Sequence, residues 1–273
     1  MVIRVVTYNI FLNQARWEKR RDLIVKELDI LDADVICLQE VVLPRNSAQE
    51  IANRLKGKYN VLVYSKHNSL EAEDTVALAI LSKQMPKEVS HLTLGSKEQR
   101  IALRATFRFG LKEVDVINTH LFWYPYNLMR TFIQRDQVKR IIQWSSSSRP
   151  TIICGDMNAV PKSRPIIEFS KRGFVSSYKN ANGSEPKWTC ANPVPSPERS
   201  TKDNLLLALY NLLRFHRFGV WRGVYDYIFI NKYLKPKKAG VFGKEPAEND
   251  STLYPSDHLG VYADISIKLG ARK

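Results

Sequence analysis

The segment PTIICGDMNAVP (150–161) places two polar side chains directly after a short apolar run. Thr151–Cys154 is β-branched and apolar, which predicts a buried strand, and Gly155 breaks the run. Because side chains alternate along an extended chain, Asp156 and Asn158 are expected to point the same way. A carboxylate can orient and deprotonate a water, and a carboxamide can donate to oxygens that gain charge, so the pair suits hydrolysis of a phosphate ester. For this tripeptide alone, an Asx turn leaving a strand is the alternative.

Nearer the N-terminus, two other apolar runs also end in a carboxamide or a carboxylate residue. Asn9 follows VVTY, and Glu40 ends DVICLQE. A carboxylate at the tip of a strand can hold a divalent cation, and Mg²⁺ prefers one or two carboxylates plus water and substrate oxygens. Taken singly, Asn9 is typical of a turn and Glu40 of a solvated strand end.

Three further constellations follow the same pattern. Asn118 and His120 end VDVINTH, two positions apart and so on one face. An imidazole there can donate to a phosphate oxygen or move a proton, although a structural histidine is the alternative. Asp226 opens YDYIFIN, and Asp257 and His258 precede the last apolar run, where an Asp beside a His offers a metal ligand or an orienting partner. Recurrence at strand ends throughout the chain predicts one site at the edge of a sandwich.

The elements that must position these residues are strands and helices in mixed order. Strand-like runs occur at 2–8, 34–39, 59–64, 75–82, 101–109, 113–119, 150–154, 225–230 and 260–267. Helical patterns occur at 16–31, 47–55, 128–144 and 163–172. In the second of them, Ser47 and Glu50 stand in capping-box register. Mixed order predicts two packed sheets with helices outside them, and the lack of a long linker predicts one domain over 1–273.

Composition restricts the partners and the compartment. The chain has 273 residues, and 42 Lys+Arg against 27 Asp+Glu give a formal charge of +15. This excess favours polyanions, nucleic acid first and anionic membrane surfaces second, with a solubility or lineage bias as the alternative; no protein partner is inferable. No signal-like leader and no apolar run near ~20 residues is seen, which predicts an intracellular, cytoplasmic protein. Three cysteines without metal-ligand spacing predict reduced thiols.

Together these motifs resemble the endonuclease/exonuclease/phosphatase superfamily, which includes deoxyribonuclease I, exonuclease III, neutral sphingomyelinases and nocturnin-like deadenylases. The resemblance runs from TYNI at Asn9 to SDHLG at His258, in the family's order. It implies an α/β fold, a four-layer sandwich of two mixed β-sheets flanked by helices. It also implies phosphoester hydrolysis that depends on Mg²⁺ or Mn²⁺.

The resemblance also implies roles for individual residues. Asn9 and Glu40 would bind the metal, and Asp257 would contribute to metal binding or water positioning. Asp156 would orient the attacking water.

The remaining roles implied by the resemblance concern the phosphoryl group. Asn158 and His120 would contact its oxygens. His258 would stabilise the developing charge, and Asp226 would orient His258.

Local details favour one branch of the superfamily. Val41 and Val42 follow Glu40 where abasic-site endonucleases typically have Thr-Lys, and Phe11 stands where those enzymes usually have Asp. By contrast, NTHLFWYP (118–125) resembles the deadenylase and 2′,5′-phosphodiesterase branch. GSEPKWT (183–189) is similar to the Gly-x-Pro-x-x-Thr element of that branch. Sphingomyelinases and tyrosyl-DNA phosphodiesterases also tolerate an LQEV motif.

An insertion at about 193–224 contains NLLLALYNLLRFHRFGVWR (204–222), which predicts an apolar helix followed by arginines among aromatic residues. Such arginines and aromatics can pair with phosphates and stack on unpaired bases. The alternatives are a helix on an anionic membrane and a helix that covers one sheet. An aromatic cluster after His120 could also meet a base or a sugar. The candidate substrate-binding residues are Asn118, Trp123, Tyr124, Arg217 and Trp221.

The sequence therefore predicts a divalent-metal-dependent phosphodiester hydrolase acting on single-stranded RNA or DNA by in-line attack of a water held by Asp156. One alternative is a sphingomyelin or phospholipid phosphodiesterase, or a phosphoinositide phosphatase, which the Leu-rich insertion would suit. Another is a DNA-repair endonuclease or tyrosyl-DNA phosphodiesterase. A catalytically inactive binding module is the third, although such a module has no chemical need for Asp156 or His258.

Overall fold

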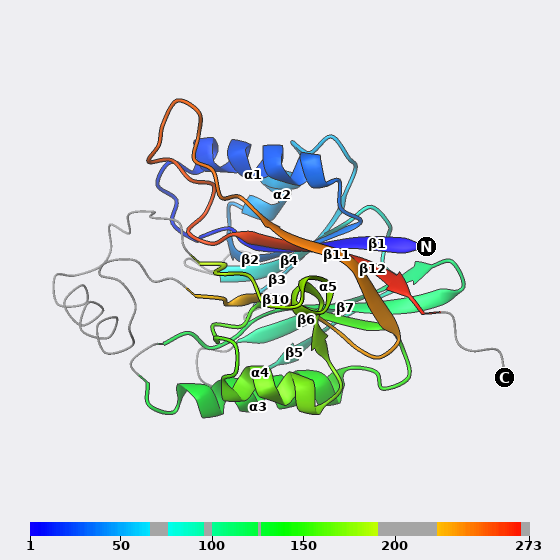
Figure 1. Cartoon of the computed structure of the whole chain (residues 1–273). Coiled ribbons are helices and arrows are strands. Elements are labelled where there is room, and N and C mark those ends of the chain that lie inside the picture. Colours follow the sequence, from blue (N-terminus) through cyan, green and yellow to red (C-terminus); the bar gives the residue numbers. More distant parts are fainter. Residues whose placement is uncertain (66–75, 96–99, 125–126, 191–222, 269–273) are drawn as a thin grey trace.

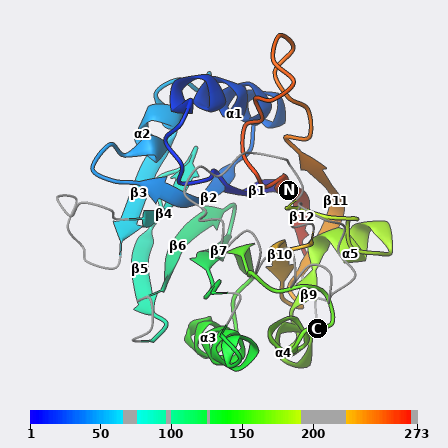
Figure 2. The same cartoon turned by 90° about the vertical axis from the view of Figure 1, so that its left-hand side faces the viewer.

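Two mixed six-stranded sheets lie face to face, with helices on both outer surfaces (Figures 1 and 2). The computed structural model describes residues 1–65, 76–95, 100–124, 127–190 and 223–268. The first sheet has the order β11-β12-β1-β2-β4-β3, and the second has the order β5-β6-β7-β8-β10-β9. The predicted four-layer sandwich is confirmed.

The strands of the first sheet are β1 (Val2–Asn9), β2 (Val35–Val42), β3 (Asn60–Ser65), β4 (Val76–Ser82), β11 (Leu234–Phe242) and β12 (Gly260–Ile267). Those of the second are β5 (Glu88–Thr93), β6 (Ile101–Phe109), β7 (Lys112–His120), β8 (Thr151–Asp156), β9 (Val175–Ser176) and β10 (Asp226–Ile230). The helices are α1 (Trp17–Leu31), α2 (Ser47–Ala52), α3 (Arg130–Trp144), α4 (Arg164–Lys171) and α5 (Ser177–Asn182).

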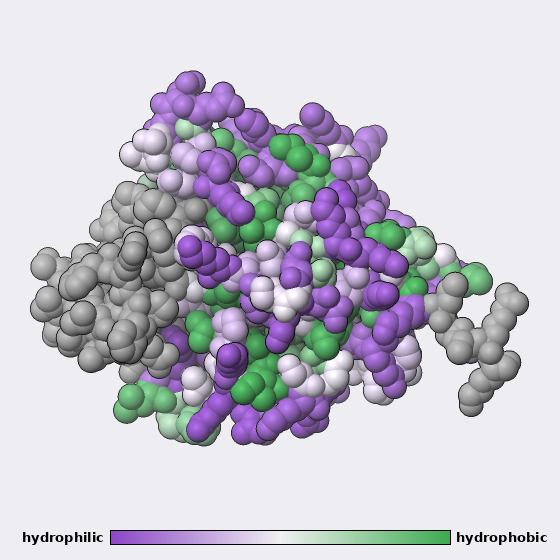
Figure 3. All heavy atoms as spheres, viewed as in Figure 1, coloured by the Kyte–Doolittle hydropathy of each residue, from purple (hydrophilic) through white to green (hydrophobic). Residues whose placement is uncertain are grey.

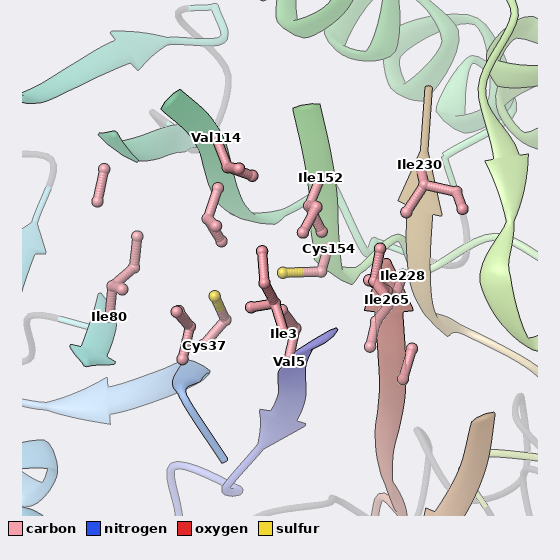
Figure 4. Close-up of a cluster of buried hydrophobic side chains, with 14 of the residues drawn as sticks. Ile3, Val5, Cys37, Ile80, Val114, Ile152, Cys154, Ile228, Ile230 and Ile265 are labelled. Atoms are coloured by element: carbon pink, nitrogen blue, oxygen red, sulfur yellow. The ribbon is translucent and has the colours of Figure 1, made fainter. Parts of the chain in front are cut away.

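Three apolar clusters hold the layers together. The central one fills the space between the sheets with β-branched side chains such as Ile3, Val5, Ile152 and Ile228 (Figure 4). A second lies between the first sheet and α1 and α2, and a third between the second sheet and α3 and α4. Strands that are apolar on both faces are what a sheet buried on both sides requires.

The topology brings the polar strand ends to one edge. β1 runs parallel to β2, and β7 runs parallel to β8, with His120 in register with Asp156. β10 is antiparallel to β8 and begins with Asp226 opposite Asp156. Residues directly opposite each other share a face of the sheet. His120, Asp156 and Asp226 therefore stand side by side on three adjacent strands.

Several predicted elements differ from the observed ones. β5, β9, β11 and α5 were not predicted. The capping box is wrong, because Asn46 is the N-cap of α2 and the Ser47 hydroxyl instead accepts from the Val42 backbone N–H. Glu50 bonds to Trp17 and two arginines. Residues 193–222, which hold most of the predicted insertion, lie outside the described residues.

The surface seen in Figure 3 is largely hydrophilic, with hydrophobic residues scattered across it. No helix in the described part of the chain is long and apolar enough to cross a membrane.

A buried guanidinium fixes the loops next to the site. Arg20 on α1 is 2% exposed and donates to the backbone carbonyls of Ile10, Phe11, Asn13 and Pro255. These carbonyls lie just after β1 and just before Asp257. Arg20 thus ties the loop that follows Asn9 and the loop that carries Asp257 to one helix.

We expect Arg20→Met to lower the free energy of unfolding by about 3 kcal/mol or more, because it leaves several carbonyls without donors. Lys19→Met, which removes the same charge from an exposed neighbouring position, should change it by less than about 0.5 kcal/mol. Urea unfolding midpoints check this prediction, and equal midpoints for the two variants would contradict it.

Candidate active site

Asp156 is the centre on which the polar strand ends converge. Its side chain is buried, and Oδ1 accepts from the backbone N–H of Asn158 at 2.8 Å. Around Oδ2 lie Asn9 Nδ2 at 3.1 Å, His120 Nε2 at 3.5 Å and His258 Nε2 at 3.8 Å. Residues from both sheets therefore meet at one carboxylate oxygen.

Glu40 reaches this centre because β2 is interrupted. The pairing of β2 with β4 shifts register between Leu38 and Val41, and Glu40 has φ of 60°. A bulge of this kind re-aims a side chain. Glu40 thus lies inside β2, not at its tip as predicted. Its Oε1 accepts from Asn9 Nδ2 at 3.0 Å, and its Oε2 accepts from the Leu12 N–H at 2.7 Å.

His258 is held by a chain of hydrogen bonds. Its Nδ1 lies 2.8 Å from Asp226 Oδ2, and that oxygen also accepts from Thr189 Oγ1 at 2.6 Å. The Thr189 hydroxyl in turn accepts from the backbone N–H groups of Tyr225 and Asp226. The predicted orienting contact of Asp226 with His258 is thus present as a hydrogen bond. Thr189 was not identified from the sequence as a site residue, although the GSEPKWT motif ends on it.

The carboxyl groups of Asp156 and Glu40, which lie on the two sheets, both have a raised pKa. Burial raises the pKa of Asp156 to about 7, and the nearby Asp226 carboxylate adds to the rise. Burial and the Asp257 carboxylate likewise raise the pKa of Glu40. Perturbed carboxyl groups facing one another are typical of functional sites.

The two imidazoles differ in charge. Burial, with help from Arg100 and His258, lowers the pKa of His120 well below its usual 6.5. Burial also opposes the charge on His258, but Asp226 and the neighbouring thiol and carboxyl groups outweigh it and raise the pKa of His258 well above 6.5. Near pH 7 the centre therefore has one neutral and one cationic imidazole.

The donor set fits a hard divalent cation. Glu40 and Asp257 offer carboxylate oxygens close enough for one to raise the pKa of the other, and a cation between them would remove that repulsion. Among the described residues, the groups of three ligand atoms within 4.8 Å are Asp156–Asp226–His258 and Cys190–Asp257–His258, so Glu40 belongs to neither. A metal on Glu40 would keep water or substrate oxygens as further ligands, as Mg²⁺ does.

Other predicted residues have different surroundings. Asn118 is fully buried, and its amide donates to the carbonyls of Leu38 and Ala79 in the opposite sheet and accepts from Gln39. It therefore joins the sheets, and this corrects its assignment to substrate binding. The Asn9 amide oxygen accepts from the Phe11 N–H, so its contact with the two carboxylates is made through Nδ2.

Asn158 has φ of 47°, and its backbone N–H bond to Asp156 forms the Asx turn that was the alternative for this tripeptide. Its side chain donates to the Leu121 carbonyl at 3.1 Å. The turn and a functional role are compatible, because it is the turn that fixes the Asp156 carboxylate.

The aromatic residues after β7 form an exposed pair. Trp123 and Tyr124 are 47% and 45% exposed, with ring centroids 5.8 Å apart. Buried Gln134 and Gln137 on α3 bond to the backbone of Phe122 and anchor this segment. Arg217 and Trp221, the other predicted substrate contacts, lie outside the described residues.

The raised pKa of Asp156 predicts a pH-dependent stability. The folded pKa of about 7 exceeds the roughly 3.9 of an unfolded aspartate, so the folded protein holds more protons between these values. Stability is therefore highest below the unfolded pKa and falls as pH rises towards 7, by at most about 1.4 kcal/mol per pH unit.

We expect the melting temperature of the metal-free protein to fall more steeply between about pH 4 and pH 7 than that of Asp156→Asn, which lacks this titration. Scanning calorimetry in a chelator checks the two slopes. Parallel curves would contradict the prediction.

Comparison with known proteins finds relatives that match most of this chain. Human Nocturnin is 25% identical over 273 residues, covering 92% of this chain and 58% of the relative. Mouse 2′,5′-phosphodiesterase 12 is 26% identical over 289 residues, covering 91% of this chain and 46% of the relative. The chain spans about half the length of the curated relatives it matches.

Among solved structures, D. rerio TDP2 complexed with single strand DNA product superposes with a TM-score of 0.73 at 17% identity, covering 97% of this chain and 99% of that one. This likeness shows a shared fold. The model of the Endonuclease/Exonuclease/phosphatase family matches residues 6–258, which include every described site residue. The chain belongs to the Endonuclease/Exonuclease/phosphatase family.

Proposed function

We propose that this protein is a divalent-metal-dependent phosphodiesterase that cleaves single-stranded nucleic acid by in-line attack of water. The observation that carries the proposal is the buried Asp156 carboxylate, surrounded by Asn9, His120 and His258 at 3.1–3.8 Å. Membership of the family supports a phosphoester substrate.

The charge of each side chain determines its proposed role in the reaction. Asp156, once deprotonated, accepts a hydrogen bond from the attacking water and takes its proton. The neutral His120 donates a ring N–H to a phosphoryl oxygen. The cationic His258, held by Asp226, stabilises the charge that develops on the other phosphoryl oxygens. Asn158 remains a proposed contact to the same group through its second amide hydrogen.

A divalent cation, when bound, supplies Lewis-acid stabilisation of the phosphoryl and leaving oxygens. Glu40 and Asp257 would hold it through their carboxylates, with Asn9 at the edge of that site. Mg²⁺ suits this oxygen-rich set, and Mn²⁺ is the proposed substitute.

The substrate proposal depends on charge and on exposed aromatics. A formal charge of +15 attracts polyanions, and Trp123 and Tyr124 offer rings on which unpaired bases can stack at about 1–3 kcal/mol each. Relatives support it, because one bears the name 2′,5′-phosphodiesterase 12 and the TDP2 structure holds a single-stranded DNA product. The charge with the exposed rings, and the names of the relatives, both favour nucleic acid over lipid as the substrate.

The test uses two labelled single strands of one sequence, RNA and DNA, each with an oligo-A tail, incubated with Mg²⁺. Stepwise loss of the RNA tail would support a deadenylase-like enzyme, and cleavage of DNA would support a general or repair nuclease. Hydrolysis of sphingomyelin or phospholipid without hydrolysis of either strand would overturn the nucleic-acid proposal. So would the absence of hydrolysis on all of these substrates.

A further inference from the structure

A thiol stands beside the proposed catalytic groups, on the residue that follows Thr189. One ligand atom from each of Cys190, Asp257 and His258 lies within 4.8 Å of the other two. Cys190 pairs with His258 through an isolated antiparallel bridge, which places their side chains on the same face. Cys190 and Asp257 are half-buried, so an ion from solvent can reach them.

The three donors together differ from what Mg²⁺ selects. Sulfur, imidazole nitrogen and one carboxylate oxygen form the kind of set that binds Zn²⁺ or Cd²⁺, whereas Mg²⁺ takes oxygens. Tetrahedral zinc with bonds of about 2.0–2.3 Å keeps its ligand atoms roughly 3.3–3.8 Å apart. Side-chain movements of about 1 Å would close the present cluster to that size.

One ring nitrogen of His258 remains for such an ion. Its Nδ1 is bound to Asp226 Oδ2 at 2.8 Å, which leaves Nε2 as the nitrogen that can bind a metal. A carboxylate behind a histidine is the usual support of a zinc-ligating imidazole. Asp226 is in turn held by the hydroxyl of Thr189, the residue next to Cys190.

We propose that Cys190, Asp257 and His258 bind a thiophilic divalent cation such as Zn²⁺, and that this ion inhibits the enzyme. Two protons leave to solvent: the thiol proton as the Zn–S bond forms, and the Nε2 proton of the cationic His258 as the Zn–N bond forms. Water fills the fourth position. While His258 and Asp257 bind this ion, His258 is not available to the phosphoryl group and Asp257 is not available to the Mg²⁺ site. The inhibition rests on the proposed function, but the binding does not.

The other two cysteines allow a matched control. Cys37 and Cys154 are fully buried in the cluster between the sheets, among residues such as Val5 and Ile80 (Figure 4). Among the described residues, neither cysteine belongs to a group of three side chains that could hold a metal ion. A metal signal from the thiol next to His258 can therefore be separated from one due to the core thiols.

Binding is tested on the full chain with Cd²⁺ alone, by its thiolate-to-metal charge-transfer absorption in the ultraviolet. We expect the wild type and Cys154→Ala to show the absorption, and Cys190→Ser to lack it. Competition with a chelator should show at least about tenfold weaker binding in Cys190→Ser, since loss of even a supporting residue costs about 10–100-fold. Absorption that persists unchanged in Cys190→Ser would overturn the proposal.

Inhibition is tested by titrating Zn²⁺ into the Mg²⁺-dependent reaction, with each variant compared to its own zinc-free rate. We expect Cys190→Ser to need at least about tenfold more Zn²⁺ for half-inhibition. Equal sensitivity of wild type and Cys190→Ser would overturn the inhibitory role. If no substrate is cleaved but Cd²⁺ binding depends on Cys190, the proposed function fails and the metal site stands.

Discussion

Replacing Asp156 with asparagine should lower kcat/KM for phosphodiester cleavage by about 10²- to 10⁴-fold, the range typical of a lost general base. The substituted amide keeps the size of the side chain, but it cannot take a proton from water. The loss should appear mainly in kcat, because Asp156 acts on the water and not on the bound strand. Steady-state kinetics at saturating Mg²⁺ checks the prediction.

Asp115→Asn is the matched control for this variant. Asp115 is also fully buried, lies within β7 away from the site, and accepts a hydrogen bond from the Thr106 hydroxyl at 2.8 Å. It should cost stability without changing turnover per folded molecule. The catalytic role of Asp156 would be contradicted if Asp156→Asn kept activity within about tenfold of wild type, or if both variants lost activity equally.

Gly155→Ala should cause a large loss of stability. Gly155 has φ of +142°, and a Cβ on it would lie 1.8 Å from the Thr119 carbonyl oxygen. Thr119 and Gly155 are paired between β7 and β8, next to the pair His120 and Asp156. The strands would have to separate at the centre of the site. We expect a loss of at least about 3 kcal/mol, from overlap and backbone strain together.

Gly95→Ala separates the two causes. Gly95 has a similar φ of +129°, but no described heavy atom lies within 4 Å of the Cβ position. It should incur only the backbone strain, about 1 kcal/mol. Urea unfolding of both variants measures the difference, and equal losses would show that the contact with Thr119 is not the cause.

The strands that position the site were predictable because they are buried on both faces. Runs such as 101–109 and 260–267 are mostly apolar, and the observed β6 and β12 have those bounds. β11 was missed because LKPKKAGVF places three lysines on the exposed side of an edge strand and contains a bulge between Pro236 and Lys238. A strand of this kind lacks the regular alternation of apolar and polar residues from which a strand is predicted.

The site residues could be recognised in the sequence as polar residues beside apolar strands. The contacts among them could not. The bulge that turns Glu40 into the site has no signature in DVICLQEVV. The bond from Thr189 to Asp226 joins residues 37 positions apart. Arg20 is one of several charged residues of its helix, and no local pattern distinguishes it from the others, whereas the structure buries it among four carbonyls. Long-range contacts of this kind depend on tertiary packing, which a single sequence does not reveal.

The most direct test of the account is the stereochemical course at phosphorus. A substrate with one chiral phosphorothioate of known configuration would be cleaved in water enriched in oxygen-18, and the configuration of the product determined. In-line attack by a water held at Asp156 predicts inversion, with the label on the phosphorothioate. Retention of configuration would mean that a protein side chain forms a covalent intermediate, and it would contradict the role given to Asp156.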